Sequence, residues 1–269
     1  MTGTATDTWA SEPRFDQERL GAFVKQLFVA AGVGADDAAQ ATDALLLADL
    51  RGVESHGVAR LPGYVGRLRA GLIDADAELT VERETPSTIA FNANNGLGLT
   101  VGSRAMSRCI AKAEETGICM ATVRRSNHFG IAGSYALMAA EQGFAGMAMT
   151  NSSAIVVPMY GKEPMLGTNP LAFAVPTGSL PFCLDMSTST VAFGKIEVAR
   201  RAGLPIPAGW GVDSDGRPTT DADAVRGLTP LGGPRETSGH KGYGLGLMVE
   251  IFCGQLASNT WSHQIGASY

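Results

Sequence analysis

The stretch ICMATVRRSNHFGIAGSYALMAAEQ, residues 118–142, contains the pattern that indicates the fold. Its first part, 118–123, is a short apolar run, which is typical of a buried strand. A polar turn follows, and 131–142 then has the composition and length of a helix. A strand that leads directly into a helix is the building unit of α/β proteins.

The same alternation continues on both sides of this stretch. Further strands are predicted at 87–91, 144–149, 171–175 and 182–185, and further helices at 97–115, 191–202 and 242–256. Alternating strands and helices predict an α/β sheet with crossover connections. The segment 203–233 is rich in proline and glycine, so we expect it to be a long surface excursion.

The N-terminal part of the chain has helical spacing instead. Apolar residues recur at this spacing from residue 15 to about residue 50, and 38–50 is predicted to be a second helix. Asp36 and Asp37 are candidate N-caps for that helix. We expect residues 1–14 to be a flexible leader, 15–80 a helical domain and 81–269 an α/β domain.

The composition excludes several classes of protein. The chain has 269 residues, of which 45% are hydrophobic and 17% are charged, and its net charge is −5. An acidic chain does not suit nucleic-acid binding, which needs a basic surface. The sequence has no predicted signal peptide or membrane span, and its four cysteines form no CxxC pair. We therefore expect a cytoplasmic protein with reduced thiols.

The segment RGVESHGVARLPGY, residues 51–64, is the first candidate for chemistry. If it is helical, His56, Arg60 and Tyr64 recur every four residues and share one face. Such a face suits anion recognition, because a guanidinium binds a carboxylate through two parallel hydrogen bonds. Pro62 and Gly63 disturb the spacing. A solvated polar face explains the pattern equally well.

His128 is the second candidate, because it follows the predicted strand 118–123. Ligands of α/β proteins usually bind at the carboxyl ends of strands. The small residues Gly130, Ala132 and Gly133 would let a ligand approach the start of the next helix closely. His128 could then act as a general acid or base, although a capping histidine would give the same pattern.

Polar residues also follow two other predicted strands, at 150–153 and 185–189. Each group alone is an ordinary cap, but together they indicate a polar ligand across the edge of the sheet. Lys241 near the start of the last helix is tolerated best where an anion, such as a cofactor phosphate, lies beside it. The sequence contains no GxGxxG fingerprint between a strand and a helix, and its histidines lack metal-ligand spacing.

Eight motifs in order resemble the malate/L-lactate dehydrogenase family, which includes ureidoglycolate and sulfolactate dehydrogenases. They are ADLRGVESHGVARLPGY, RRSNHFGIAGSYA, GFAGMAMTNS, GTNPLAFAVP, LDMSTS, GKIEVARRAGLPIPAGWGVD, GRPTTD and GHKGYGLGLMVE. The resemblance implies a non-Rossmann nicotinamide-binding sheet domain of the L-sulfolactate dehydrogenase type, beside a smaller N-terminal helical domain. It also implies a homodimer, and it accounts for the missing glycine fingerprint.

The resemblance assigns roles to residues of this chain. It gives proton transfer to His128, or in some members to His56, and it places Arg60, Tyr64 and Thr168 at the substrate. Lys195 is a third catalytic candidate, at a position where the imine-reducing branch tends to have aspartate. The implied cofactor contacts are Phe129, Gly130, Ser152, Asp185, Met186, Ser187, His240 and Lys241.

The expected function is hydride transfer between NAD or NADP and a small 2-hydroxy acid, as in malate or lactate dehydrogenases. The alternatives are a cyclic imino acid reductase and an inactive, truncated binding or structural protein. The second alternative arises because the family continues past the position of Tyr269, and residues 257–269, ASNTWSHQIGASY, lack a recognisable ending. We expect a small-molecule substrate and no metal, membrane or nucleic-acid partner.

Overall fold

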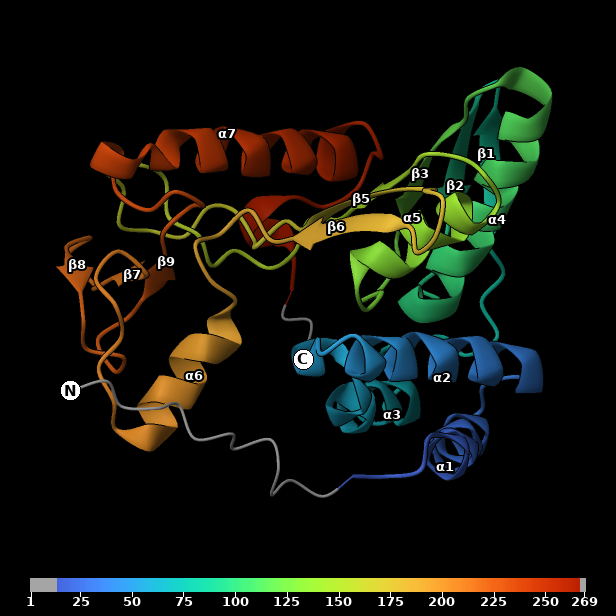
Figure 1. Ribbon diagram of the computed structural model, residues 1–269, viewed down its shortest axis with the longest axis horizontal. Coiled ribbons are helices and arrows are strands. Elements are labelled where there is room, and N and C mark those ends of the chain that lie inside the picture. The colour runs from blue at the N-terminus through green and yellow to red at the C-terminus, as the bar shows by residue number, and fades with distance from the viewer. Residues whose placement is uncertain (1–13, 267–269) are drawn as a thin grey trace.

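A computed structural model describes residues 14–266 of the chain, so nearly all of the expected leader 1–14 lies outside the described residues. The N-terminal part is helical, as predicted. Its helices are α1 (Gln17–Ala30), α2 (Ala35–Leu50) and α3 (Leu61–Arg69). They pack together along one side of the molecule (Figure 1), and Val24, Phe28 and Leu45 form the centre of their shared core.

The expected caps of α2 are corrected by the structure. α2 begins three residues earlier than predicted, with Gly34 at its N-cap and no side-chain cap. Asp36 and Asp37 lie inside its first turn, where carboxylates favour the helix dipole. Asp37 also forms an ion pair with Arg104, 2.5 Å between Oδ1 and Nη2. This pair links the helical part of the chain to the helix that follows the first two strands.

The first sheet has the order β1-β2-β3 and contains one parallel crossover. Its elements are β1 (Thr80–Glu84), β2 (Thr88–Asn92), α4 (Gly98–Thr116) and β3 (Met120–Arg124). β2 and β3 run parallel with α4 between them, as predicted, and β1 pairs antiparallel with β2. The sequence did not predict β1, because all five of its residues are exposed and give no apolar alternation.

The second sheet has the order β4-β5-β6 and is antiparallel throughout. It consists of β4 (Gly146–Met149), β5 (Leu171–Val175) and β6 (Phe182–Met186), with α5 (Ala132–Glu141) before it in the chain. The expectation of crossover connections is therefore wrong for this sheet, because no helix lies between its strands. Alanines of α5 pack on Ala172 and Ala174 of β5, and their small size lets the helix lie close to the sheet.

The C-terminal part contains a small third sheet beside α6 (Phe193–Ala202). This sheet has the order β8-β7-β9, with β7 (Gly211–Val212), β8 (Pro218–Thr219) and β9 (Gly227–Leu228). The expectation of a mere surface excursion over 203–233 is wrong. Single apolar residues between the turns are buried: Ile206, Val212, Ala222, Val225 and Leu228.

The last long helix is α7 (Gly239–Glu250), which continues into one π-helical turn over Ile251–Gln255. This matches the predicted helix 242–256 within a few residues at each end. α7 lies along the face of the molecule opposite α1 to α3 (Figure 1). Among residues 14–266, no helix is both long and apolar enough to cross a membrane.

Candidate active site

The segment that carries His56 and Arg60 is not one helix, as its spacing suggested. It forms two short 3₁₀ turns, Glu54–His56 and Val58–Arg60, and α3 begins directly after them. Gly57 separates the turns, and a Cβ on it would lie 1.7 Å from Oδ1 of Asp49. Oδ2 of Asp49 accepts a hydrogen bond from the Val58 N–H at 2.8 Å. The end of α2 therefore holds this segment in place.

Pro62 does not disturb the backbone of this segment, contrary to the expectation from the sequence. It lies in the first turn of α3, where a missing N–H costs nothing because that N–H has no partner within the helix. The helix then carries Tyr64 into the core, where its ring lies against Phe28 with 6.4 Å between ring centroids. His56, Arg60 and Tyr64 thus lie on one side of the segment, as predicted, although two 3₁₀ turns and the start of α3 place them there instead of one helix.

His56, Arg60, Tyr64 and His128 form what we call the histidine cluster. The rings of His56 and His128 are stacked, with centroids 5.4 Å apart and planes at 22°. The Tyr64 hydroxyl is hydrogen-bonded to Nδ1 of His128. The structure thus brings together two histidines that are far apart in the sequence, beside the arginine and tyrosine predicted to bind an anion.

Neighbouring groups orient the members of this cluster. The Ser55 hydroxyl lies 2.9 Å from Nδ1 of His56. Nε of Arg60 donates to the carbonyl oxygen of Ser55 at 2.6 Å, which fixes the plane of the guanidinium. The Gly130 N–H donates to Nδ1 of His128 at 3.3 Å. Each histidine therefore has one ring nitrogen already engaged by the protein.

Burial and a nearby positive charge keep both histidines neutral. Burial, followed by the Arg60 guanidinium, lowers the pKa of His56 from 6.5 to about 4. Burial lowers the pKa of His128 to about 3, and the positive charges of His56 and Arg60 contribute in the same direction. Both imidazoles are thus uncharged at neutral pH, which is the form that can accept a proton.

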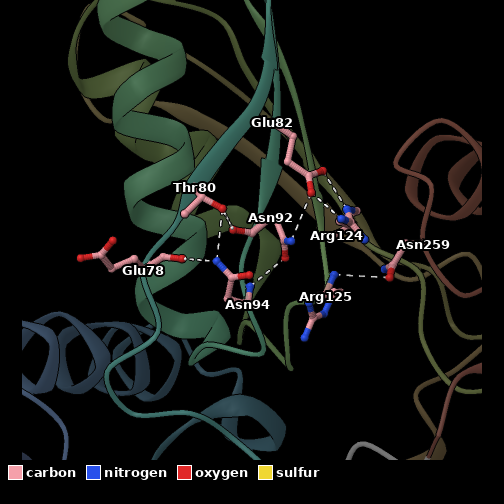
Figure 2. Close-up of polar contacts among 8 residues, drawn as sticks. All are labelled: Glu78, Thr80, Glu82, Asn92, Asn94, Arg124, Arg125 and Asn259. Carbon is pink, nitrogen blue, oxygen red and sulfur yellow. Dashed lines mark hydrogen bonds and ion pairs between the residues drawn. The ribbon is translucent and has the colours of Figure 1, made fainter.

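The loop that carries His128, residues 124–130, is anchored to the β1–β2 side of the molecule. The amide of Asn127 donates to the carbonyl oxygens of Asn95 and Gly96, both at 3.0 Å. The guanidinium of Arg124 binds Glu82 through two nitrogens. Figure 2 shows this pair with Asn92 beside it, and the Arg125 N–H directed at the Asn259 side chain. His128 therefore projects from a loop with many fixed points.

A second group of predicted residues gathers at one edge of the β4-β5-β6 sheet. Met149, Leu171 and Met186 are paired in register there, so the segments that adjoin them lie side by side. The Thr168 N–H donates to Oγ of Ser152 at 3.1 Å, and their two hydroxyl oxygens are 3.4 Å apart. The predicted row of polar residues at the strand ends thus exists, on an antiparallel sheet rather than a parallel one.

Asp185 lies on β6 and caps α5. Its Oδ2 accepts a hydrogen bond from the Gly133 N–H at 2.7 Å. Burial raises the pKa of its carboxyl, while the Gly133 N–H and the Arg51 guanidinium lower it. A Cβ on Gly133 would lie 2.8 Å from this carboxylate oxygen. At Gly133 the structure therefore places the protein's own carboxylate where the sequence analysis expected room for a ligand.

The remaining predicted residues lie in other elements. Phe129 and Gly130 follow His128 directly, and Met186 and Ser187 follow Asp185. His240 and Lys241 are exposed in the first turn of α7. Lys195 is exposed on α6, with its ammonium 5.9 Å from the centroid of the Trp210 ring. The described contacts of Lys195 include neither histidine of the cluster.

Three residues of the site region were missed by the sequence analysis: Asn127, Asn169 and Glu250. The amide of Asn127 fastens the His128 loop, and the side chain of Asn169 binds the Ser152 N–H at 3.1 Å. Glu250 is buried inside an apolar helix. A charge in such a helix was the available signal, because buried charges need partners. Among residues 14–266, no three His, Cys, Asp or Glu side chains come together in a way that could hold a metal ion.

Comparison with known proteins decides the family. A family profile described as malate/L-lactate dehydrogenase matches residues 15–269. The chain belongs to this family. Malate dehydrogenase of Pyrococcus horikoshii is 48% identical over 256 residues, which are 94% of this chain and 71% of that protein. The solved structure of malate dehydrogenase from Pyrococcus horikoshii OT3 matches 95% of this chain and 71% of that one, with a TM-score of 0.88 and 42% identity.

The names of two other relatives include a nicotinamide cofactor. A (2R)-3-sulfolactate dehydrogenase (NADP(+)) of Chromohalobacter salexigens is 38% identical, covering 89% of this chain and 71% of that protein. Ureidoglycolate dehydrogenase (NAD(+)) of Escherichia coli is 34% identical, covering 95% and 72%. The predicted fold class is confirmed by these likenesses. The prediction of an NAD(P)-dependent hydroxy-acid dehydrogenase is confirmed at the level of the family.

One solved structure of the family has a different chemistry in its name. Δ1-piperideine-2-carboxylate reductase from Pseudomonas syringae has a TM-score of 0.86 and 33% identity. The match covers 95% of this chain and 76% of the chain of that reductase. The fold alone therefore does not separate a hydroxy-acid dehydrogenase from an imine reductase.

Proposed function

We propose that this chain interconverts malate, or a closely related small 2-hydroxy acid, and the corresponding 2-oxo acid at the histidine cluster. The observation that carries this proposal is the stacked, neutral pair of His56 and His128 beside Arg60. A neutral base beside a fixed positive charge suits a substrate that has a carboxylate next to a hydroxyl group. The 48% identical malate dehydrogenase supports malate as the first substrate to test.

His128 is the proposed proton acceptor when the 2-hydroxy acid is oxidised. Nε2 is the ring nitrogen proposed to accept the proton of the substrate hydroxyl, in the tautomer in which Nδ1 carries the hydrogen and donates it to the Tyr64 hydroxyl. The 3.3 Å bond from the Gly130 N–H to Nδ1 belongs to the other tautomer. A tyrosine hydroxyl both donates and accepts hydrogen bonds, so Tyr64 can remain bonded to Nδ1 before and after His128 is protonated. His56 is the proposed alternative acceptor, and its charge would oppose that of His128.

Arg60 and Tyr64 are the proposed substrate-binding residues, with Thr168 as a further contact. The bond from Nε of Arg60 to Ser55 holds the guanidinium in one plane. A fixed guanidinium can bind a carboxylate through two parallel bonds and so orient the substrate before reaction. A carboxylate placed there would also raise the pKa of both histidines, because it reverses the local sign of charge.

The donors at the sheet edge suit a polar dinucleotide. NAD or NADP, when bound, would supply the acceptor for the hydride of the substrate carbon, and the protein's part is to bind and orient the cofactor. The proposed contacts supply hydroxyls, backbone groups and cationic or ionisable side chains at several elements. They are Phe129, Gly130, Ser152, Asp185, Met186, Ser187, His240 and Lys241.

The decisive experiment measures His128→Ala with NADH and NADPH and a panel of 2-oxo acids that includes oxaloacetate, pyruvate and sulfopyruvate. Loss of a general acid or base costs about 10²–10⁴-fold in rate, so kcat should fall by that factor while NADH binding persists. His263→Ala is the matched control, because His263 is exposed and contacts only Trp261 among the described rings. Unchanged turnover by His128→Ala would remove His128 from the mechanism.

A cyclic imino acid reductase is the second candidate, and the Pseudomonas syringae structure favours it. The same assay with Δ1-piperideine-2-carboxylate separates the two reactions. We expect the 2-oxo acids to be reduced faster. Lys195 is included as a variant, Lys195→Asp, because it tests whether that position governs the choice between a hydroxy acid and an imine.

We also propose that the protein is a cytoplasmic homodimer that binds neither membranes nor nucleic acid. One face of the β4-β5-β6 sheet is covered by α5, but Met147, Phe173 and Leu184 are paired in a row on the other face. Met147 is 53% exposed and Leu184 is 40% exposed, so this row suits a subunit contact. Leu184→Asp should halve the mass measured by light scattering. The four free thiols support the proposed cytoplasmic location, and the net charge of −5 supports the proposal that the protein does not bind nucleic acid.

A further inference from the structure

A carboxylate with neutral partners lies beneath the sheet-edge residues. Glu250, the last residue of α7, is only 2% exposed. Its Oε1 accepts hydrogen bonds from the Asn151 amide at 3.0 Å and from the Ser262 N–H at 2.9 Å. Its Oε2 accepts one from the Asn169 amide at 2.7 Å. Three neutral donors therefore converge on one buried charge.

Asn169 links Glu250 to Ser152 through hydrogen bonds of its side chain. The side chain of Asn169 is fully buried, and its two amide hydrogens are bound by Glu250 and by the carbonyl oxygen of Gly246. Its Oδ1 accepts the Ser152 N–H at 3.1 Å. A reversed amide would break all three bonds, so Glu250 selects the one orientation that binds Ser152. Asn169 also has a φ of +38°, a backbone conformation that needs such support.

Ser152 in turn is joined to Thr168. Its Oγ accepts the Thr168 N–H, and the carbonyl oxygens of Thr168 and Asn169 accept the Thr188 hydroxyl at 3.1 and 3.2 Å. Gly167 completes the close contact, because a Cβ there would lie 2.2 Å from Oγ of Ser152. The turn before β5 and the turn after β4 therefore form one hydrogen-bonded unit, which Asn169 links to Glu250.

We propose that Glu250 is a positioning residue for cofactor and substrate binding, acting through Asn169 on Ser152 and Thr168. This inference rests on the proposed function, which places Ser152 at the cofactor and Thr168 at the substrate. In this proposal Glu250 acts on both molecules only through these residues. Its charge is needed because a carboxylate accepts hydrogen bonds at both oxygens, whereas an amide accepts at one end and donates at the other. A buried donor left facing an NH₂ group loses its bond and disturbs the turn.

The test is Glu250→Gln, which preserves size and removes one acceptor. Binding of NADH and NADPH is followed by fluorescence titration, and kcat and KM are measured for the 2-oxo acid that the wild-type protein reduces fastest. We expect the dissociation constant of the reduced cofactor, and KM, to rise about fivefold or more, with kcat changed less than about threefold. Val249→Ala is the matched control, because it opens a cavity next to Glu250 in the same helix without touching the network.

A purely structural role would lower the melting temperature of both variants and leave cofactor affinity alike in both. That result would overturn the proposal.

Two further outcomes also test the proposal: misfolding of Glu250→Gln, and absence of cofactor binding by the wild-type protein. If Glu250→Gln does not fold, Glu250→Asp replaces it, because it keeps the charge but withdraws it from Asn169 by one methylene. A folded Glu250→Asp with wild-type cofactor affinity would contradict the proposal. If the wild-type protein itself binds neither NADH nor NADPH, the proposed function fails, whatever the variants do.

Discussion

The histidine cluster and the Glu250 network are both buried polar groups, but they treat charge in opposite ways. In the cluster, burial and Arg60 drive two titratable side chains to their neutral forms. In the network, three neutral donors surround a carboxylate and satisfy both of its oxygens. The first arrangement keeps its groups able to gain a proton. The second fixes the shape of two turns.

Because the two sites treat charge differently, we expect substitutions in them to affect activity and stability differently. The cluster holds groups that can gain a proton or bind an anion, so changes there should alter turnover more than folding. The network joins two turns and a helix through one carboxylate, so changes there should alter folding and ligand affinity together. A variant of the cluster that lost stability without losing turnover would contradict this division.

After His128→Ala, Arg60→Ala should have the largest effect on turnover. Loss of a charged hydrogen-bonding partner costs about 1.5–3 kcal/mol, so kcat/KM for a 2-oxo acid should fall by about 10–150-fold. Arg60→Lys should not restore it, because an ammonium lacks the planar fork. Steady-state kinetics check this against Arg69→Ala, an exposed arginine of the helix that follows. Equal kinetics for the two alanine variants would exclude Arg60 from substrate binding.

Gly167→Ala should have the next largest effect, on stability. A Cβ there would collide with Ser152, and overpacking of this kind costs about 1–3 kcal/mol. Each kcal/mol lowers the melting temperature of a chain of this size by about 2–4 °C. Calorimetry on Gly167→Ala and on Gly178→Ala, which has nothing within 4 Å of its new Cβ, checks the prediction. Equal melting temperatures for the two variants would show that the contact between Gly167 and Ser152 does not require glycine.

Acid should destabilise the protein through the histidine cluster. The pKa values of His56 and His128 are about 4 and about 3 when folded, against 6.5 when unfolded. Below pH 6.5 the unfolded chain therefore binds more protons, so stability falls as the pH falls from about 6.5 to about 4. The slope is at most about 1.4 kcal/mol per pH unit for each histidine.

Urea midpoints at several pH values between about 7.5 and about 4.5 measure this slope across the window in which the histidines differ between the two states. The double variant H56N/H128N should show a shallower decline than the wild-type protein. If both proteins lose stability in parallel, the acid sensitivity arises in other groups and the neutral state of the cluster is not the cause.

Tyr64→Phe should have the smallest effect. It removes the hydroxyl from Nδ1 of His128 but keeps the ring against Phe28. One neutral hydrogen bond is worth about 0.5–1.5 kcal/mol, so kcat should fall about two- to tenfold with little change in melting temperature. The pH profile of kcat should also shift, because Nδ1 of His128 loses the hydroxyl group to which it is hydrogen-bonded. An unaltered profile and rate would show that Tyr64 serves packing alone.

The sequence could predict the elements with clear periodicity. β5 (Leu171–Val175) was predicted to the residue, and α4, α5, β3 and β6 within about two residues, because short apolar runs and helical spacing are local signals in the sequence. It could not predict β1, which has no buried face, or the antiparallel order of the second sheet, which depends on pairing between distant segments. The small β8-β7-β9 sheet was missed because its strands have two residues each.

For the site, the sequence could nominate His56, Arg60, Tyr64 and His128, since a short spacing and a strand end are local signals. It could not show that the two imidazoles stack, because His56 and His128 belong to segments joined only by tertiary packing. Glu250 and Asn169 are 81 positions apart, and neither has a pattern around it that names the other. Long-range polar networks of this kind require coordinates.

The unequal anchoring of the two histidine-bearing segments bears on how the substrate range could be redesigned. Residues 124–130 are tied by Asn127, by the Arg124 pair and by the Arg125 N–H. Arg125 has left-handed backbone, as do Asn94 and Asn95 in the segment to which this loop is bonded. Insertions or random substitutions in that loop would break several bonds at once. The 3₁₀ turns over residues 54–60 depend mainly on Asp49 and Gly57. A library aimed at new hydroxy acids should therefore vary positions of 54–60 other than His56, Gly57 and Arg60, and leave the His128 loop unchanged.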